Sequence, residues 1–526
     1  MTNEINLANY VNGQWVNGDG AGASLINPVN GEEVARAGSA GIDIAAALQF
    51  ARAEGNAKLQ ELTYAQRAAC LARAAEVLTV NREVYYQLAM ANSGNTAADA
   101  AFDVDGAIGT LKYYAGVGKG LGDTHYLVEP ELDRLGRDPN FQAVHIHTAL
   151  RGVAIHVNAF NFPAWGLWEK AAVSLLAGVP VFAKPATATS LLTQQMVRDV
   201  VDAQILPEGS LSVICGGGHD LMDHVRTGDV VFFTGSADTA AKLRSNPNVQ
   251  ASGVRFNVEA DSVNLSLLGP DVESASPLFE AFIKEVAREM TFKAGQKCTA
   301  IRRILVPAGS IHAVAEALAA RLAKTTVGDP REEGVRMGPL VNKSQQQAAL
   351  EGIEILRTEA SVVYGADPQF SPVGADAERG CFIQPTLLRC DNPLEAERVH
   401  DTEVFGPVAT LMPYADESEA YALAALGGGS LAGSVFTQDD AFAARASVQL
   451  SSSHGRLLVI DESIMSGHSG HGVVMPQCVH GGPGRAGGGE ELGGLRALRA
   501  YHQRTAVQGT LPRLEALVAA GASYRG

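Results

Sequence analysis

Between residues 152 and 236 the sequence repeats one pattern, in which a short apolar run stops at glycine, proline or asparagine and a helix-like segment follows. Apolar runs of this length, without polar alternation, are typical of strands buried on both faces in a parallel sheet. Alternation of such strands with helices predicts an α/β domain. The runs are GVAIHVNAF, GVPVFAKP, GSLSVICGGG and DVVFFTGS, with SLLTQQMVRDVVDAQ and SADTAAKLRSN as helices.

A second set of apolar runs follows the first and predicts a second α/β domain. The 526 residues are enough for two to four domains. Residues 45–93 carry helical periodicity, and the text beyond Ser466 is rich in glycine and histidine and predicts a loop-rich segment. The second set comprises SVNLSLLG, RRILVPA, VATLMPY and RLLVIDES, with IHAVAEALAARLAKT as a helix.

Charge and composition exclude several classes of partner. The net charge of −16 disfavours nucleic acid and anionic lipid, which bind clustered Lys and Arg. No apolar run approaches the roughly 18 residues of a membrane span, and the first 30 residues lack the pattern of a signal peptide. The six cysteines form no CxxC pair, and the histidines near Cys478 fit no zinc spacing, so we expect a cytoplasmic protein with no metal site.

A glycine-rich stretch, Gly482–Gly487, satisfies the dinucleotide pattern GxGxxG. The physical mechanism of that fingerprint requires a strand before the first glycine and a helix after it. Here QCVHG precedes the motif and a proline lies inside it. We therefore expect a glycine loop at a subunit contact or at the rim of a pocket.

Three short segments carry residues that could bind a ligand or react with one. Lys184–Pro185 ends an apolar run, where open α/β sheets bind ligands, and Thr187 follows as a possible helix cap. Gly235–Ser236 forms another strand-turn-helix junction, where backbone N–H groups can hold phosphate. Cys298, in AGQKCTA, is either a nucleophile or core filling on this evidence alone.

Seven segments, in this order, resemble the aldehyde dehydrogenase superfamily: NAFNFP, LLAGVPVFAKPAT, LPEGSLSVICGGG, FFTGS, FNVEADSVN, AGQKCTA and EVFGPVA. The resemblance extends from YVNGQWVNG to about Tyr501. It implies two doubly wound α/β domains with a small β oligomerisation arm, and a homodimer. The implied ranges are 1–135 and 151–261 for the NAD(P)-binding domain, 262–475 for the catalytic domain, and 136–150 and 476–526 for the arm and C-terminal loop segment.

The resemblance also implies roles for individual residues. Cys298 falls on the family's nucleophile, Glu259 on its general base and Asn161 on its oxyanion donor. The chemistry needs these types, because a thiolate attacks the aldehyde, fixed donors stabilise the oxyanion and a base activates water against the thioester. The implied cofactor contacts are Lys184 with Pro185 and Thr187 at the adenosine ribose, Gly235 and Ser236 at the pyrophosphate, and Glu403 and Phe405 at the nicotinamide.

Two departures from the family pattern bear on these roles. Relatives carry Leu-Gly-Gly-Lys after the base, whereas this chain has Ala260–Val263, so the orientation of Glu259 is open. NAD-preferring relatives carry glutamate three residues after the lysine, where this chain has Thr187. Because threonine does not repel a 2′-phosphate, we expect NADP to be accepted and preferred, with NAD as a possible second cofactor.

The segment MPQCVHGGPGRAGGGEELGG is similar to a branch of semialdehyde dehydrogenases that act on ring-opened coenzyme A (CoA) thioesters in the breakdown of benzoate and other aromatic acids. This likeness implies an aldehyde substrate that is a CoA thioester, such as 3,4-dehydroadipyl-CoA semialdehyde. Two alternatives stay open. One is a CoA-acylating aldehyde dehydrogenase, in which free CoA resolves the thioester, and the other is a non-catalytic scaffold of the same fold.

Overall fold

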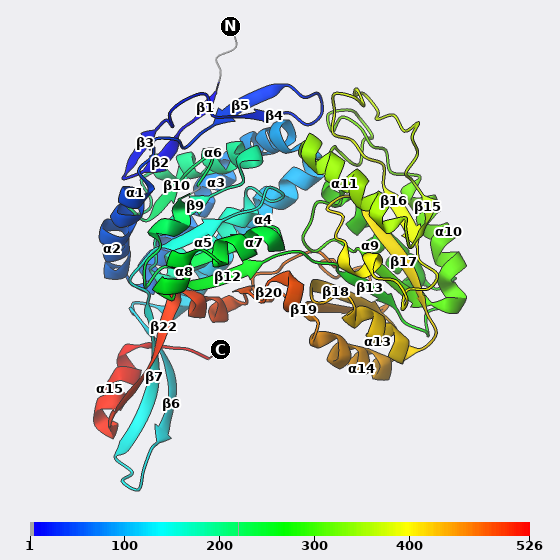
Figure 1. Cartoon of the computed structure of the whole chain (residues 1–526). Helices are drawn as coiled ribbons and strands as arrows, with labels where there is room; N and C mark the ends of the chain where they lie inside the picture. The colour runs from blue at the N-terminus through cyan, green and yellow to red at the C-terminus, as the bar shows by residue number, and fades with distance from the viewer. Residues whose placement is uncertain (1–4, 219, 526) are drawn as a thin grey trace.

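The computed structural model describes residues 5–218 and 220–525, and two seven-stranded sheets form its framework (Figure 1). The first sheet has the order β12-β11-β8-β9-β10-β2-β3, and its neighbours from β12 to β10 run parallel. The four apolar runs of the first set form β8, β9, β10 and β11, which confirms the predicted α/β domain. Its strands are β2 (Asn9–Val11), β3 (Gln14–Val16), β8 (Ala154–Val157), β9 (Val181–Lys184), β10 (Leu211–Val213), β11 (Val230–Thr234) and β12 (Arg255–Glu259).

The second sheet has the order β15-β16-β17-β14-β13-β18-β19 and is parallel except for β15 at its edge. The four apolar runs of the second set form β13, β14, β17 and β19, and β18, which lies between β13 and β19, comes from a run that the sequence analysis did not single out. Its strands are β13 (Leu265–Leu268), β14 (Arg303–Pro307), β15 (Ser361–Tyr364), β16 (Thr386–Arg389), β17 (Val408–Tyr414), β18 (Ser430–Phe436) and β19 (His454–Ile460).

Helices cover both sheets and supply much of the buried apolar surface. The predicted helical stretch 45–93 is broken, because Leu62 is extended and Thr63 caps a new helix through its side chain. The helices of the first domain are α1 (Ile44–Phe50), α2 (Asn56–Glu61), α3 (Tyr64–Ser93), α4 (Ala97–Leu121), α5 (Trp165–Ala177), α6 (Ser190–Asp202), α7 (Ala237–Arg244) and α8 (Pro247–Ser252). Those of the second are α9 (Pro277–Thr291), α10 (Ile311–Leu322), α11 (Lys343–Leu356), α12 (Arg398–Asp401), α13 (Glu417–Ala425) and α14 (Asp440–Ser451).

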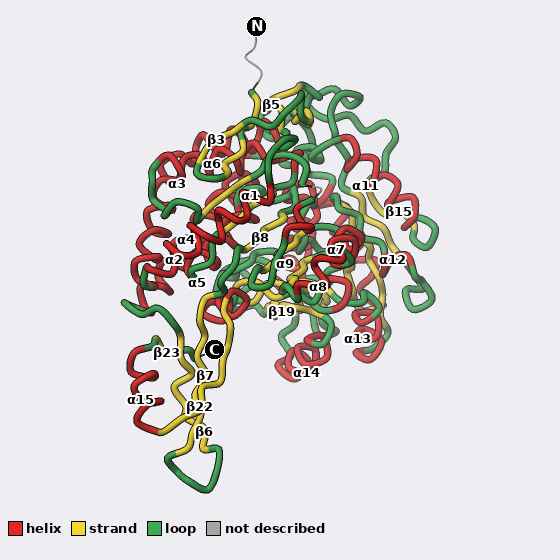
Figure 2. Tube along the Cα trace, turned by 60° about the vertical axis from the view of Figure 1, so that its left-hand side comes forward, coloured by secondary structure: helices red, strands yellow, loops and turns green. Residues whose placement is uncertain are grey.

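A four-stranded sheet of order β22-β7-β6-β23 projects from the body as an arm, with α15 beside it (Figures 1 and 2). The arm is larger than the predicted range 136–150, because β6 pairs with β7 in a register that starts at Leu127↔His147. Its elements are β6 (Leu127–Arg134), β7 (Phe141–Ala149), β22 (His502–Thr510), α15 (Leu511–Ala520) and β23 (Ala522–Ser523).

Residues 476–501, which the resemblance places in the arm and C-terminal loop segment, do not join the arm sheet. They form a separate hairpin, β20 (Val479–Gly481) with β21 (Glu490–Leu492), which contacts β19, β12 and α5 between the two large sheets. Further small elements are β1 (Asn6–Leu7), β4 (Ala23–Ile26) and β5 (Glu33–Ala37), which make a three-stranded sheet. Among the described residues, no helix combines the length and hydrophobicity that a membrane span requires.

Candidate active site

The loop that carries Cys298 is a strained turn after α9. Lys293 and Ala294 both have φ of 52°, and Gly295 has φ of 68°, so three consecutive residues adopt left-handed backbone conformations. A Cβ atom at Gly295 would lie 2.1 Å from the carbonyl oxygen of Gly406. Glycine is therefore required at 295 both by backbone conformation and by close approach of the neighbouring chain. Such strain persists only where the surroundings fix it.

Two buried side chains hold this loop. The Nδ2 group of Asn264 donates to the carbonyl oxygens of Cys298 and Ala300 at 2.7 and 2.9 Å. The Arg302 guanidinium donates to the carbonyl oxygens of Gly295 and Gly406 at 2.7 and 2.6 Å. The position of the sulfur is thus set by hydrogen bonds from the residues that directly precede β13 and β14, rather than by the loop alone. Sequence reasoning missed both anchors.

Cys298 is half-buried and lines two cavities, of about 520 Å³ and about 810 Å³. The larger cavity is walled by aromatic side chains, which suits an apolar entrance for a substrate. The smaller cavity collects seven of the ten predicted site residues. These seven are Asn161, Gly235, Ser236, Glu259, Cys298, Glu403 and Phe405.

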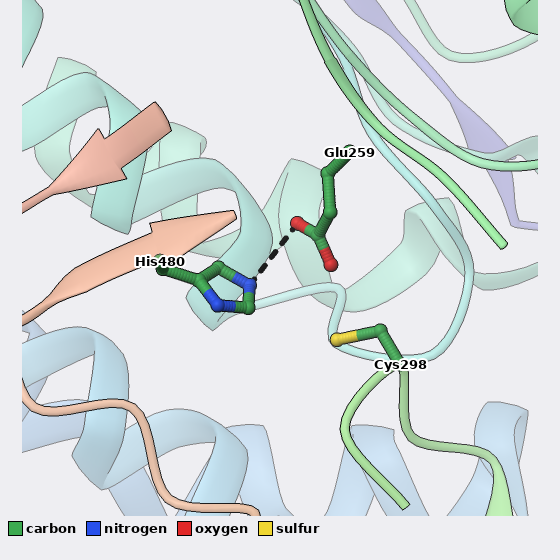
Figure 3. Close-up of side chains that lie close together, drawn as sticks. All are labelled: Glu259, Cys298 and His480. Atoms are coloured by element: carbon green, nitrogen blue, oxygen red, sulfur yellow. Dashed lines mark ion pairs between the residues drawn. The ribbon is translucent and has the colours of Figure 1, made fainter. Parts of the chain in front are cut away.

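Glu259, Cys298 and His480 lie together at the end of β12 (Figure 3). Their side-chain oxygen, sulfur and nitrogen atoms all lie within 4.8 Å of one another. The Nε2 atom of His480 is 3.2 Å from Oε2 of Glu259, an ion-pair distance when the imidazole is protonated. The pair is not aligned as a hydrogen bond, and neither ring nitrogen has a hydrogen-bond partner among the described residues.

The surroundings shift the pKa values of Glu259 and Cys298 in opposite directions. Burial alone would raise the pKa of Glu259, but the charges of His480 and Lys170 and the Cys298 thiol lower this pKa to about 2. Burial and the neighbouring Glu259 raise the pKa of the Cys298 thiol well above its usual value. At neutral pH the resting site therefore holds the Glu259 carboxylate beside the protonated Cys298 thiol. The carboxylate is a base, and it lies next to the thiol proton that must be removed before the sulfur can react.

A buried ionic group lies behind Glu259. Lys170 on α5 contacts the carboxylates of Glu169 and Glu491, the latter at 3.1 Å. Burial lowers the pKa of Lys170, but the surrounding carboxylates outweigh this effect and raise its pKa above the usual value. Sequence reasoning missed this group, although charged residues in the apolar stretch WGLWEKAAVSLLA were an available signal.

The predicted nicotinamide contacts, Glu403 and Phe405, line the smaller cavity. Burial raises the pKa of Glu403 to about 7, and its Oε2 accepts a hydrogen bond from the Ser262 backbone at 3.1 Å. The buried Oε1 of Glu403 and Oγ1 of Thr234 have no hydrogen-bond partner among the described residues. These two atoms are free to bind the hydroxyl groups of a ribose. The Phe405 ring packs edge-on against Phe160, with centroids 5.6 Å apart.

The phosphate junction at Gly235–Ser236 is already partly occupied. The Ser236 hydroxyl caps α7 by accepting from the Thr239 backbone at 3.3 Å. The backbone N–H of Ala237 donates to Asp261 at 3.1 Å, so a carboxylate lies at the N-terminus of this helix. The structure thus brings Ser236 to the cavity but commits its side chain to the helix.

The remaining predicted residues lie away from this cavity. Thr187 lines a separate cavity of about 470 Å³, together with Gly216 and Asp220. The half-buried Lys184 side chain passes along Gly218, beside that second region. Pro185, which follows Lys184 in the sequence, is buried and lines neither cavity.

The glycine stretch 482–487 is not the start of a cofactor helix. It forms a single 3₁₀ turn, Gly484–Ala486, whose Arg485 side chain lines the smaller cavity. Gly487 has φ of 107°, and a Cβ atom there would lie 2.3 Å from the carbonyl oxygen of Val258. The stretch therefore packs against β12 and forms part of the rim of the pocket, one of the two places expected for it.

Known proteins resemble this chain over nearly its full length. A 3,4-dehydroadipyl-CoA semialdehyde dehydrogenase from Aromatoleum evansii is 56% identical over 479 residues, which cover 91% of this chain and 93% of the relative. An alpha-ketoglutaric semialdehyde dehydrogenase from Bacillus subtilis is 28% identical, with 84% and 87% covered.

Among solved structures, a betaine aldehyde dehydrogenase from Staphylococcus aureus superposes with a TM-score of 0.83 at 24% identity, covering 96% of both chains. That likeness establishes the predicted fold of two α/β domains. The sequence profile of the aldehyde dehydrogenase family matches residues 15–507. A thiol between two cavities, in this fold and with these relatives, identifies an oxidoreductase that acts on aldehydes: the chain belongs to the aldehyde dehydrogenase family.

Proposed function

We propose that this aldehyde dehydrogenase oxidises a CoA-linked semialdehyde, with 3,4-dehydroadipyl-CoA semialdehyde as substrate, to the carboxylic acid with NADP as cofactor. The observation that carries the substrate proposal is the 56% identity, over 91% of the chain, to the Aromatoleum evansii relative. The large cavity beside Cys298 supports it, because its aromatic walls suit the carbon chain of such an aldehyde.

In the proposed reaction the Cys298 sulfur bonds to the aldehyde carbon as its proton passes to a neighbouring base, for which Glu259 is placed. The Asn161 amide and the Cys298 backbone N–H stabilise the oxyanion that forms. The nicotinamide cofactor, when bound, accepts the hydride that leaves this carbon. After Glu259 has passed the thiol proton to solvent, its carboxylate activates a water molecule against the resulting thioester, which releases the acid and frees the sulfur.

The site fits a nicotinamide dinucleotide. The free oxygens of Glu403 and Thr234 are acceptors for ribose hydroxyl groups, and Phe405 offers an apolar wall. The N-terminus of α7 and the region of Lys184 and Thr187 extend the same edge of the first sheet. We assign the adenosine end to the cavity at Thr187, because this is where an open α/β sheet binds ligands at its strand ends.

The preference for NADP follows from Thr187. A glutamate at this position would face a 2′-phosphate, and two like charges about 4 Å apart repel by roughly 4 kcal/mol at an effective dielectric constant near 20. We expect Thr187→Glu to lower kcat/KM for NADP far more than for NAD. Equal kcat/KM values for NADP in the variant and the wild type would contradict this role of Thr187.

The substrate proposal is tested with a panel of straight-chain aldehydes, with and without a CoA tail, using each cofactor. We expect the highest kcat/KM for the CoA-linked semialdehyde and a free carboxylic acid as product. Formation of a new acyl-CoA that requires added free CoA would instead establish a CoA-acylating enzyme. Equal kcat/KM with and without the tail would exclude recognition of the CoA moiety.

We also propose a homodimer built through the arm, and a cytoplasmic location. The arm supports the dimer because β22 forms one edge of its sheet, and that edge has no partner strand among the described residues. Exposed strand edges of this kind pair readily with another chain. Light scattering on the purified protein tests the assembly, and a monomeric mass would contradict it.

A further inference from the structure

His480 is a fully buried histidine whose ring nitrogens make no hydrogen bond within the described chain. Its ring packs edge-on against Trp165, with centroids 5.7 Å apart, and its Nε2 lies 3.2 Å from Glu259. A buried imidazole without a hydrogen-bond partner is costly for folding. Its position beside the carboxylate and the thiol therefore calls for a role that packing alone does not supply (Figure 3).

We propose that His480 is a positioning residue for Glu259, holding the carboxylate beside the Cys298 sulfur and receiving the proton that Glu259 takes from water. This inference rests on the proposed function, in which Glu259 is the general base. The residue comes from β20, whose backbone is fixed by pairing with β21 in the register His480↔Glu491. The imidazole is thus brought to the site by the hairpin that follows the catalytic domain.

Several charged groups face this imidazole from the elements packed around it. Glu259 on β12 and the Cys298 thiol lie within 4.8 Å of its nitrogen. Behind Glu259 lies the buried group of Lys170, Glu169 and Glu491, which combines one cation with two carboxylates. Arg456 on β19 adds a further, half-buried cation near Cys298 and Glu259. Of these carboxylates, Glu259 is the one that lies 3.2 Å from the imidazole, so it is the one that can exchange a proton with His480 directly.

The charge of the imidazole controls how strong a base Glu259 is. When His480 is protonated, its charge stabilises the carboxylate and leaves Glu259 a weak base. When the imidazole is neutral, this stabilisation is lost and the carboxylate accepts a proton more readily.

The proton transfer balances within the hydrolysis step. As the water oxygen bonds to the thioester carbon, one water proton passes to Glu259 and then to the neutral imidazole. The tetrahedral centre collapses, the carbon–sulfur bond breaks, and the sulfur leaves with the electron pair as a thiolate. His480 returns its proton through Glu259 to the sulfur, which restores the thiol, while the acid product loses its proton to solvent.

The proposal is tested with a variant of His480 that keeps an aromatic ring but lacks the two ring nitrogens. His480→Phe preserves an aromatic ring against Trp165 and removes both nitrogens. Because misplacement of a general base typically lowers a rate by about 10- to 100-fold, we expect kcat to fall by this factor, with little change in KM for aldehyde or cofactor. We also expect the low-pH limb of the kcat profile to move to higher pH, because Glu259 loses the charge of His480 that lowers its pKa. His480→Gln, which keeps a polar side chain but cannot take up a proton, should show the same altered limb.

A second buried histidine provides the control. His502 also packs edge-on against an aromatic ring, that of Tyr64, and lines neither cavity beside Cys298. His502→Phe should leave kcat and its pH profile unchanged. If His480→Phe keeps kcat within about threefold of wild type with the same low-pH limb, the ring serves packing alone and the proposal is wrong.

Glu259→Gln separates this proposal from the proposed function. With the base assignment intact, Glu259→Gln still releases one reduced cofactor per site, but in a slower burst because the thiol also loses its base, and then turns over slowly. His480→Phe should keep that burst amplitude and slow only the later phase. If Glu259→Gln turns over as fast as wild type, the base assignment itself fails, whatever His480 does. If Glu259→Gln is slow and His480→Phe is not, only the role of His480 is refuted.

Discussion

Replacing Asn264 by alanine should damage catalysis more than it damages the fold. Asn264 is fully buried and makes four hydrogen bonds: two donated to the carbonyls of Cys298 and Ala300, and two accepted from Ser262 and the Ala432 backbone, at 2.7 to 2.9 Å. At about 1 kcal/mol for each lost hydrogen bond, Asn264→Ala should lower the free energy of unfolding by about 4 kcal/mol.

The effect on rate comes through the position of the sulfur. Loss of the donor to the Cys298 carbonyl frees a loop with three left-handed residues, and a shift of about 1 Å typically costs about 100-fold in rate. Asn264→Asp should be as slow as Asn264→Ala, because it keeps the two accepted bonds but turns an oxygen toward two carbonyls. The assays are stopped-flow formation of reduced cofactor, the alkylation rate of Cys298 and the thermal unfolding midpoint.

Asn248 is the matched control for this prediction. Asn248 is half-buried in the first turn of α8, and its Nδ2 also donates to two backbone carbonyls, those of Met222 and Val225, at 3.0 and 2.8 Å, but it lines neither cavity beside Cys298. Asn248→Ala should lower stability by about 1–2 kcal/mol and leave kcat unchanged. The reasoning is refuted if Asn264→Ala loses stability yet keeps kcat within about threefold of wild type.

Three further perturbations follow from the site. The pKa of Glu403, raised to about 7, predicts that KM for the cofactor increases as the pH falls below 7 and the carboxylate takes up a proton; Glu403→Gln should flatten this dependence in steady-state kinetics. Gly295→Ala should abolish activity and lower the unfolding midpoint, because its Cβ would lie 2.1 Å from the Gly406 oxygen. Lys297→Met should destabilise the fold by about 3–5 kcal/mol, because it leaves Glu289 buried and unpaired, and adding Glu289→Leu should recover most of this loss in urea unfolding.

Strand identity was predictable from the sequence where an apolar run was short and ended at a helix breaker. GVAIHVNAF and DVVFFTGS satisfy both conditions, and both are strands of the first sheet. SLAGSVF does not, because glycine and serine interrupt it, yet it forms β18 at full burial. Its pairing with β13 and β19 supplies the missing information, and such pairing is long-range and cannot be read from a local window.

Site residues that belong to a family motif could be predicted from the sequence. A residue that reaches the site only because the fold brings two distant segments together could not. Cys298, Glu259 and Asn161 were found by their motifs and line one cavity. His480 was considered only as a metal ligand and rejected, because its glycine-rich surroundings carried no spacing signal. Its approach to Glu259 depends on the hairpin β20–β21, which brings residues more than 200 positions apart into contact.

The departure at Ala260–Val263 illustrates how a changed motif can still hold Glu259, the proposed base, at the end of β12. The Glu259 backbone carbonyl accepts a hydrogen bond from Gly235, and the Ala260 backbone donates to Ala486, so β12 is held on both sides as the base is reached. Asp261 then caps α7, and the Ser262 backbone donates to Glu403. Without the two glycines and the lysine of its relatives, this chain ties the segment after Glu259 to α7 through the Asp261 side chain and to Glu403 through the Ser262 backbone. An added carboxylate at the N-terminus of α7 also competes with an anionic ligand there, so Asp261→Asn should tighten cofactor binding, and a higher Kd in titration calorimetry would contradict this account.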